Sequence, residues 1–292
     1  MDSTDAAFAQ SRAARRARPP PDGTIDRPAA TKRARRSPTM HAGRSGVLGP
    51  VPPNRPARRP HMPLQLDFFE PARADGNPDR MIRLRGFLER VLRLAERQVL
   101  PLLPLRDRIV VAAGVDPART IRETGIGARA WATDRVDVWI DPAHPWVEAA
   151  GEEELLAMLA HELHHCARWT RPGYGTTLGE ALVSEGLACV FETGFRGGVP
   201  PFWARALDAT ALRDVEAKAR PHYDDRRYDH REWFIGAPER GLPRHTGYSL
   251  GFELVARHVH ATGRTAAQLV GVPAAAFLER VATAERSLAP EL

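Results

Sequence analysis

Residues 152–169 read EEELLAMLAHELHHCARW and carry the clearest helical pattern of the chain. Leu155, Leu159 and Leu163 recur every four residues and form one apolar stripe of a helix. Three glutamates open the stretch, where they complement the positive end of the helix dipole, and a Pro-Gly pair at 172–173 closes it. The pattern therefore predicts a helix over 152–169.

Within this helix, His161, Glu162 and His165 complete the motif H-E-x-x-H. Side chains at positions i and i+4 lie on one helix face, so both imidazoles can direct a nitrogen at one ion, with Glu162 beside them as a non-ligand. This arrangement is typical of zinc hydrolases. His164 could ligate in place of His165, but we interpret it as a hydrogen-bonded helix residue.

A third metal ligand is expected downstream, because a catalytic zinc takes three protein ligands and keeps a fourth position open for water. Glu185 lies twenty residues after His165, inside the apolar helical stretch LVSEGLA, where an unpaired carboxylate would be costly to bury. Glu180 is the rival, but it forms a T-x-x-E capping box with Thr177. Five residues along a helix also turn the two carboxylates about 140° apart, so they cannot share one face. We expect Glu185 to be the ligand.

The chain resembles the gluzincin metallopeptidases, in which H-E-x-x-H is followed by a glutamate on the next helix. It looks most similar to a bacterial family of predicted zinc-dependent proteases. The resemblance rests on three segments: LAHELHH at 159–165, TLGEALVSEGLA at 177–188 and GYSLG at 247–251. It covers the chain from about residue 108 to the C-terminus, and it implies a zincin-like domain that binds Zn²⁺ and acts on peptides or proteins.

One residue departs from the pattern of that family. Directly after Glu-Gly-Leu-Ala the resemblance leads us to expect a carboxylate, usually Asp, that orients a ligand histidine, whereas this chain has Cys189. Either Glu192, one turn further along the same helix face, substitutes for it, or the site is weaker. Cys189 itself is either a soft zinc contact or, in our interpretation, a small buried apolar residue.

The mechanism that the resemblance implies is metal-assisted hydrolysis. Zn²⁺ lowers the pKa of bound water toward about 7 and polarises the scissile carbonyl. Glu162 takes the water proton and passes it to the leaving amine. Tyr248 or His245, three residues apart at the start of a later helix, is the candidate donor to the developing oxyanion. The alternative for Tyr248 is ordinary packing with its hydroxyl satisfied.

We expect an α+β fold, in which a small sheet packs on a mainly helical zincin-like metallopeptidase domain. Apolar spacing predicts a helix over 78–99, and the shorter runs at 108–113, 128–133 and 136–140 predict a strand and a hairpin. Further helices are predicted at 177–191, 202–219, 248–261, 265–270 and 273–286. The strand at 136–140 is either the sheet edge along which an extended peptide adds or an ordinary core strand.

The predicted domain organisation has three parts: a basic arm at 1–62, a helical segment at 63–106 and the metallopeptidase domain at 107–292. Of the net charge of +6, the arm carries +9 and the remainder −3. The arm is rich in Pro and Arg and lacks apolar periodicity, so we expect it to be disordered. It is the one part of the chain through which binding to nucleic acid is expected.

Composition and apolar runs restrict the other partners. The two cysteines cannot form a disulfide framework, no secretion signal is recognised, and no apolar run approaches the ~20 residues of a membrane span. We expect a cytoplasmic protein without a membrane partner. The function predicted is a zinc metallopeptidase. The alternatives are another metal-dependent hydrolase or degenerate metalloprotease, and a nucleic-acid-associated protein with a structural metal site.

Overall fold

The computed structural model describes residues 64–69, 78–105 and 107–278. The predicted arm at 1–62 and most of the predicted helix at 273–286 lie outside these residues. The described chain consists of helices and one small mixed sheet, so the predicted α+β class is confirmed. None of the helices in these ranges has the length and apolar content of a membrane span.

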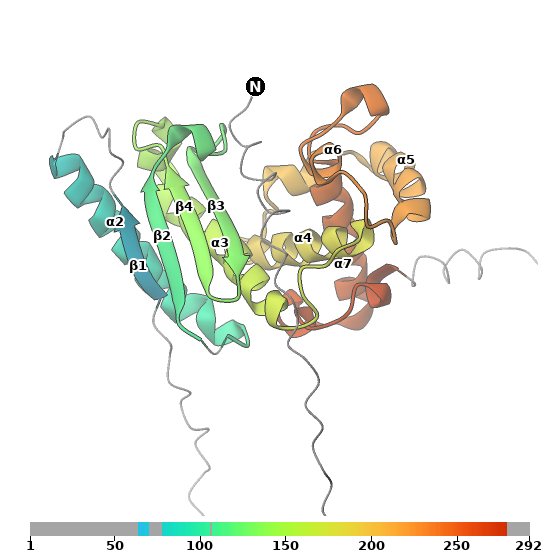
Figure 1. Ribbon diagram of the computed structural model, residues 1–292, viewed down its shortest axis with the longest axis horizontal. Helices are drawn as coiled ribbons and strands as arrows, with labels where there is room; N and C mark the ends of the chain where they lie inside the picture. Colours follow the sequence, from blue (N-terminus) through green and yellow to red (C-terminus); the bar gives the residue numbers. More distant parts are fainter. Residues whose placement is uncertain (1–63, 70–77, 106, 279–292) are drawn as a thin grey trace, which may run out of the picture. The chain divides into compact units, whose positions relative to one another are not determined.

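Four strands form the sheet in the order β1-β2-β4-β3 (Figure 1). Their bounds are β1 (Leu64–Phe69), β2 (Ile109–Val115), β3 (Ile126–Ala132) and β4 (Arg135–Ile140). β2 pairs in parallel with both β1 and β4, whereas β3 and β4 form an antiparallel hairpin. The hairpin agrees with the prediction from the alternating apolar residues.

The segment at 63–106 is not wholly helical, because it contains strand β1, which was not predicted. The Leu64 side chain is buried, and its backbone N–H donates to Glu96 Oε1 at 2.7 Å. β1 is six residues long and pairs with β2 in a register that starts at Leu64 and Ile109. A strand of this length can be identified only from its pairing with another strand. Here that strand, β2, begins about 40 residues further along the chain.

Strand β4 lies between β2 and β3, so of the two alternatives for 136–140 the sheet edge is excluded. Val136, Val138 and Ile140 have no exposed surface, which agrees with the alternative of a core strand. The second strand of the hairpin is internal because it pairs in parallel with β2. β3 therefore forms the edge of the sheet on this side.

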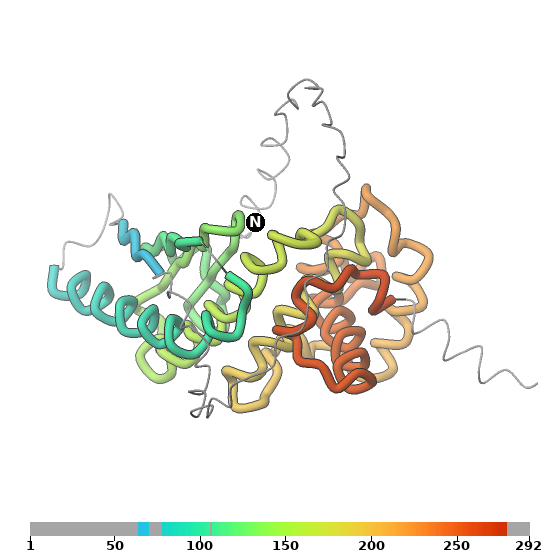
Figure 2. Tube along the Cα trace, turned by 90° about the horizontal axis from the view of Figure 1, so that it is seen from below, coloured from blue at the N-terminus to red at the C-terminus, as the bar shows by residue number. Residues whose placement is uncertain are grey.

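Helices α2 (Pro78–Gln98) and α3 (Pro145–Thr170) contact each other and the sheet. Figure 1 shows both behind the strands, and Figure 2 shows α2 running along the sheet. α3 begins before the predicted start, with His144 as its N-cap, and Ala150 interrupts it with φ −144°. The continuous part that follows Ala150 contains the predicted helix.

The C-terminal half is built from α4 (Leu178–Thr193), α5 (Ala209–Ala219), α6 (His230–Phe234), α7 (Thr246–Thr262) and α8 (Ala266–Leu269). The predicted capping box at Thr177 is present, and Thr265 forms another with Gln268. The predicted helix at 202–219 is divided, because the turn Phe202–Arg205 ends before Asp208 caps α5. The other 3-10 turns are Leu100–Leu102, Pro117–Arg119, Arg220–His222 and Pro238–Arg240.

Helices α4 and α7 cross at two glycines. A Cβ on Gly186 would lie 2.0 Å from the carbonyl oxygen of Gly251, and a Cβ on Gly251 would lie 2.2 Å from that of Leu182. Any larger residue would push the helices apart. The crossing thus brings together two of the segments that carry the family resemblance, at 177–188 and 247–251.

Two apolar clusters hold these elements together. The larger joins the sheet, α2, α3, one side of α4 and the segment around α8. The smaller lies between α4, α5, α6 and α7, and Phe234 and Leu250 are fully buried in it. α3 and α4, which carry the predicted ligands, are thereby enclosed on most sides.

Candidate metal centre

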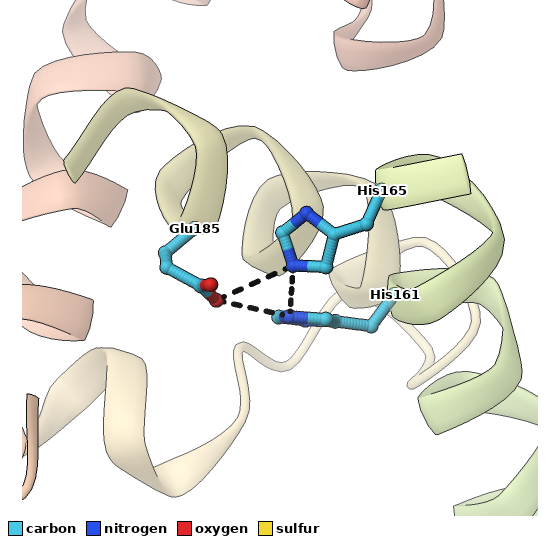
Figure 3. A group of neighbouring side chains, drawn as sticks. All are labelled: His161, His165 and Glu185. Carbon is cyan, nitrogen blue, oxygen red and sulfur yellow. Dashed lines mark hydrogen bonds and ion pairs between the residues drawn. The ribbon is translucent and has the colours of Figure 1, made fainter. Parts of the chain in front are cut away.

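His161 and His165 of α3 and Glu185 of α4 converge on one point (Figure 3). The Nε2 atoms of the two histidines lie 3.1 Å apart. Glu185 Oε2 lies 3.2 Å from His161 Nε2 and 3.4 Å from His165 Nε2. All three side chains are buried. The structure therefore brings together the three residues that the sequence singles out as metal ligands.

The surroundings of this cluster favour a positive charge at its centre. Burial by itself lowers the pKa of His161, yet contacts with Cys189, Glu185 and Glu192 raise that pKa well above its ordinary value. Burial likewise raises the pKa of Glu185, but the neighbouring histidines hold it well below its usual range. A metal cation would supply the charge that the geometry favours.

The spacing of the three atoms also fits zinc. Donor atoms about 2.0–2.1 Å from a tetrahedral zinc lie about 3.3 Å from one another. The observed separations of 3.1, 3.2 and 3.4 Å bracket that value. Two imidazole nitrogens and one carboxylate oxygen are, in addition, a donor set that zinc accepts with a fourth position open.

A chain of charges, which runs from buried Glu192 through half-buried Arg196 to buried Glu154, fixes the orientation of His161. Its Nδ1 donates to Glu192 Oε2 at 3.0 Å, since an ionised carboxylate can only accept. Glu192 Oε1 accepts from Arg196 Nε at 2.8 Å, and Arg196 Nη1 donates to Glu154 Oε2 at 2.7 Å. With a cation in place of the second ring proton, His161 would keep its proton on Nδ1 and present the lone pair of Nε2 to that cation.

Cys189 lies beside this chain of charges. Its sulfur belongs to a second group of possible ligand atoms with His161 and Glu192, all within 4.8 Å of one another. Burial raises the pKa of the Cys189 thiol to about 11, so the thiol is protonated at neutral pH.

Tyr174, in the loop between α3 and α4, reaches the cluster although the sequence analysis did not single it out. Its hydroxyl donates to Glu185 Oε1 at 2.6 Å, and its ring lies 5.5 Å from that of His165. Burial and the charge of Glu185 raise the pKa of the Tyr174 hydroxyl well above its ordinary value. The signal available in the sequence was an aromatic residue between two glycines, at 173–175, just before the helix of Glu185.

Glu162 is oriented by strand β3. Its Oε2 accepts a hydrogen bond from the backbone N–H of Ala130 at 2.6 Å, and the contact is buried. The side chain thus points toward β3, at the edge of the sheet.

Two alternative ligands lie elsewhere. His164 Nε2 is 3.2 Å from the carbonyl oxygen of Ala266, and burial together with the charge of His165 lowers the pKa of His164 to about 3. The carboxylate of Glu180 accepts from the backbone N–H groups of Thr176 and Thr177. Their positions agree with the predicted roles of hydrogen-bonded helix residue and capping residue.

The two candidate oxyanion donors differ in their surroundings. Burial raises the pKa of the Tyr248 hydroxyl well above its ordinary value, and the charge of Glu185 contributes. The ring of His245 packs against Phe202 and Tyr248, at 5.6 and 6.0 Å. Burial and the charge of the adjacent arginine lower the pKa of His245 to about 4. Of the two candidates, Tyr248 is the one whose pKa is shifted by a residue of the cluster, Glu185.

Further aromatic residues, from the segment at 200–244, pack near Tyr174, whose ring lies 6.4 Å from that of His230. The Tyr228 hydroxyl lies 3.2 Å from His230 Nδ1, and the His230 ring stacks on Phe234 at 4.2 Å. Burial and the charge of Glu185 raise the pKa of Tyr228, and burial lowers that of His230 to about 4. Tyr228 and His230 therefore lie within range of the charge of Glu185.

Fold and site together define a class: an α+β protein with a buried cluster of two histidines and one carboxylate, suited to a metal ion. The chain belongs to the family described as predicted Zn-dependent protease (DUF2268), whose sequence profile matches residues 94–279. The resemblance to a family of predicted zinc-dependent proteases is thereby confirmed.

A curated relative is the uncharacterized protein YjaZ of Bacillus subtilis (strain 168). It is 30% identical to this chain over 131 residues, which cover 42% of this chain and 49% of the relative. The chain thus matches about half the length of that relative. No solved structure matches the chain significantly.

Proposed function

We propose that the protein is a zinc metallopeptidase in which His161, His165 and Glu185 hold the metal. The observation that carries the proposal is the convergence of three buried donor atoms 3.1–3.4 Å apart. The family description supports a zinc-dependent protease at the level of class.

When bound at such a site, Zn²⁺ lowers the pKa of a water ligand and polarises a carbonyl group. Glu162 is assigned the role of general base, which accepts the proton of the attacking water and delivers it to the leaving amine. Its hydrogen bond from Ala130 N–H supports this assignment, because it holds the carboxylate in one place through both proton transfers.

Tyr248 is assigned the stabilisation of the oxyanion. The charge of Glu185 acts on its hydroxyl, and burial keeps that hydroxyl protonated and able to donate. His245 remains the second candidate. It is the N-cap of α7 and adopts the left-handed backbone conformation with φ 66°, which needs support from its surroundings in a non-glycine residue.

The substrate proposed is a peptide or protein in an extended conformation. Among the described strands, β3 pairs with β4 alone, and its Ala130 contacts Glu162. An extended backbone that added to β3 would pass the candidate base. This replaces β4 as the strand proposed to align the substrate.

The test combines metal analysis with hydrolysis of a labelled unfolded protein such as casein. Purified protein should contain about one zinc per chain, and Glu162→Gln should retain that zinc while losing hydrolysis by a factor of at least ~10². Glu153→Gln, an exposed glutamate of the same helix, is the matched control and should leave both unchanged.

Two outcomes would contradict the proposal. Hydrolysis that survives Glu162→Gln would exclude Glu162 as the base. A zinc-loaded wild-type protein that hydrolyses no peptide bond would favour a degenerate metalloprotease or a hydrolase of another substrate class.

A further inference from the structure

We propose that Tyr174 is a positioning residue that restricts Glu185 to a single ligand oxygen and so keeps one coordination position of the metal open. The inference rests on the metal centre of the proposed function. It adds a role for a residue of the loop between α3 and α4.

The two oxygens of Glu185 have different partners. Oε2 faces His161 and His165, at 3.2 and 3.4 Å. Oε1 accepts the hydroxyl of Tyr174 at 2.6 Å, a short bond of the kind formed between a hydroxyl and an ionised carboxylate. An oxygen engaged in this way is turned from the point on which the nitrogens converge.

The backbone of Tyr174 is anchored as firmly as its hydroxyl. Its carbonyl oxygen accepts from Ser184 Oγ at 2.6 Å, and Ser184 precedes Glu185 in α4. Ser184 Oγ in turn accepts from Arg168 Nε at 2.9 Å. Arg168 lies one turn after His165 and is 1% exposed. Tyr174 is therefore held by both helices that carry ligands.

Arg168 extends this anchoring to a third segment. Its Nη1 donates to the carbonyl oxygens of Val270 and Val272, at 2.9 and 3.0 Å. Burying a charged guanidinium among neutral acceptors costs more desolvation free energy than burying a neutral side chain. Burial accordingly lowers the pKa of Arg168 to about 10. Its bonds connect α3, α4 and the chain after α8.

The backbone path of this loop depends on two residues that follow Tyr174, namely Gly175 and Glu180. Gly175 has φ +109°, and a Cβ there would lie 2.2 Å from the Cβ of Glu180. Glu180 holds the next two residues through its capping contacts. A glycine after Tyr174 and a capping glutamate thus fix the path that brings the hydroxyl to Glu185.

The chemical consequence concerns the coordination number. A carboxylate that ligates through both oxygens occupies two positions. With two histidines it would take the position that water needs on a tetrahedral zinc, or make the site five-coordinate when water also binds. A hydrogen bond that engages one oxygen disfavours this. Partners of this kind set the geometry of a ligand, and their loss typically lowers metal affinity 10–100-fold.

The experiment compares wild-type protein, Tyr174→Phe and Tyr223→Phe, each loaded with cobalt(II) and, separately, titrated with zinc against a chromophoric chelator. Tyr223→Phe removes a buried hydroxyl that has no hydrogen-bond partner in the described residues, so it is a matched control. For Tyr174→Phe we expect weaker visible absorption of cobalt, as five-coordinate sites give, and zinc affinity lower by about 10–100-fold. Tyr223→Phe should match wild type in both.

A cobalt spectrum and a zinc affinity of Tyr174→Phe equal to those of wild type would overturn the inference. Should this variant not fold, a crystal structure of the zinc-loaded wild type decides. One Glu185 oxygen on zinc with the other on Tyr174 supports the inference, and ligation through both oxygens overturns it.

The result is separable from that of the proposed function. If wild type binds zinc but hydrolyses no peptide, the proposed function fails while both metal readouts still test Tyr174. If wild type is active and Tyr174→Phe shows unchanged spectrum and affinity, only the inference fails. If wild type binds no metal, both fail.

Discussion

Glu192 accepts a hydrogen bond from His161 Nδ1 at 3.0 Å, three residues beyond the position at which the family resemblance leads us to expect a carboxylate. Cys189 occupies that position, on the same face of α4. The contact that a carboxylate at 189 would have made is thus made by Glu192. The structure agrees with the first of the two possibilities raised by Cys189, namely substitution by Glu192.

Glu192→Gln should weaken zinc binding about 10–100-fold, because the amide lacks the charge that holds the Nδ1 proton of His161 and that pairs with Arg196. Competition with a chromophoric chelator measures the change. Glu153→Gln again serves as the control, since it removes an exposed carboxylate from α3. Equal affinities in the two variants would show that Glu192 does not act on the metal site through His161.

Cys189→Ser should leave the zinc content unchanged. The second group of candidate ligand atoms includes His161 and Glu192, but the hydrogen bond between those two residues already occupies His161 Nδ1. The near-isosteric hydroxyl preserves the volume of the buried thiol. Metal analysis after dialysis provides the measurement, and loss of zinc from this variant would identify Cys189 as a ligand.

Gly251→Ala should destabilise the protein by about 1–3 kcal/mol, because the added methyl would meet the backbone of α4 at Leu182 and could be relieved only by separating the helices. Urea unfolding gives the change in the free energy of unfolding. Gly86→Ala, in α2, has only the tip of Arg90 nearby and should instead stabilise by about 0.5–1 kcal/mol. The same sign for both substitutions would contradict the close packing of α4 on α7.

Local patterns in the sequence sufficed for α3, α4 and the hairpin. The two-histidine motif and the capping box at Thr177 depend on residues within one or two helical turns of each other. Glu185 could be singled out because a carboxylate inside an apolar helix needs a partner. These inferences require no knowledge of which elements touch.

The features that escaped prediction depend on contacts between distant segments. β1 and the internal position of β4 follow from parallel pairing across long connections, for which the strands themselves carry no signal. The contact of Tyr174 with Glu185 depends on the path of one loop. A hydrophobic pattern reports which face of an element is buried, not which neighbour buries it.

Zinc should raise the stability of the folded protein, because an ion that binds the folded state alone stabilises it by about 2.7 kcal/mol at a hundredfold excess over its dissociation constant. The measurement is the shift in melting temperature between zinc and chelator. Glu162→Gln should show the full shift and His165→Ala none, since only the second removes a proposed ligand. Each shift compares the same variant with zinc and with chelator. The loss of stability caused by replacing a buried histidine is present in both measurements and therefore cancels. A full shift in His165→Ala would mean that the stabilising ion is bound elsewhere.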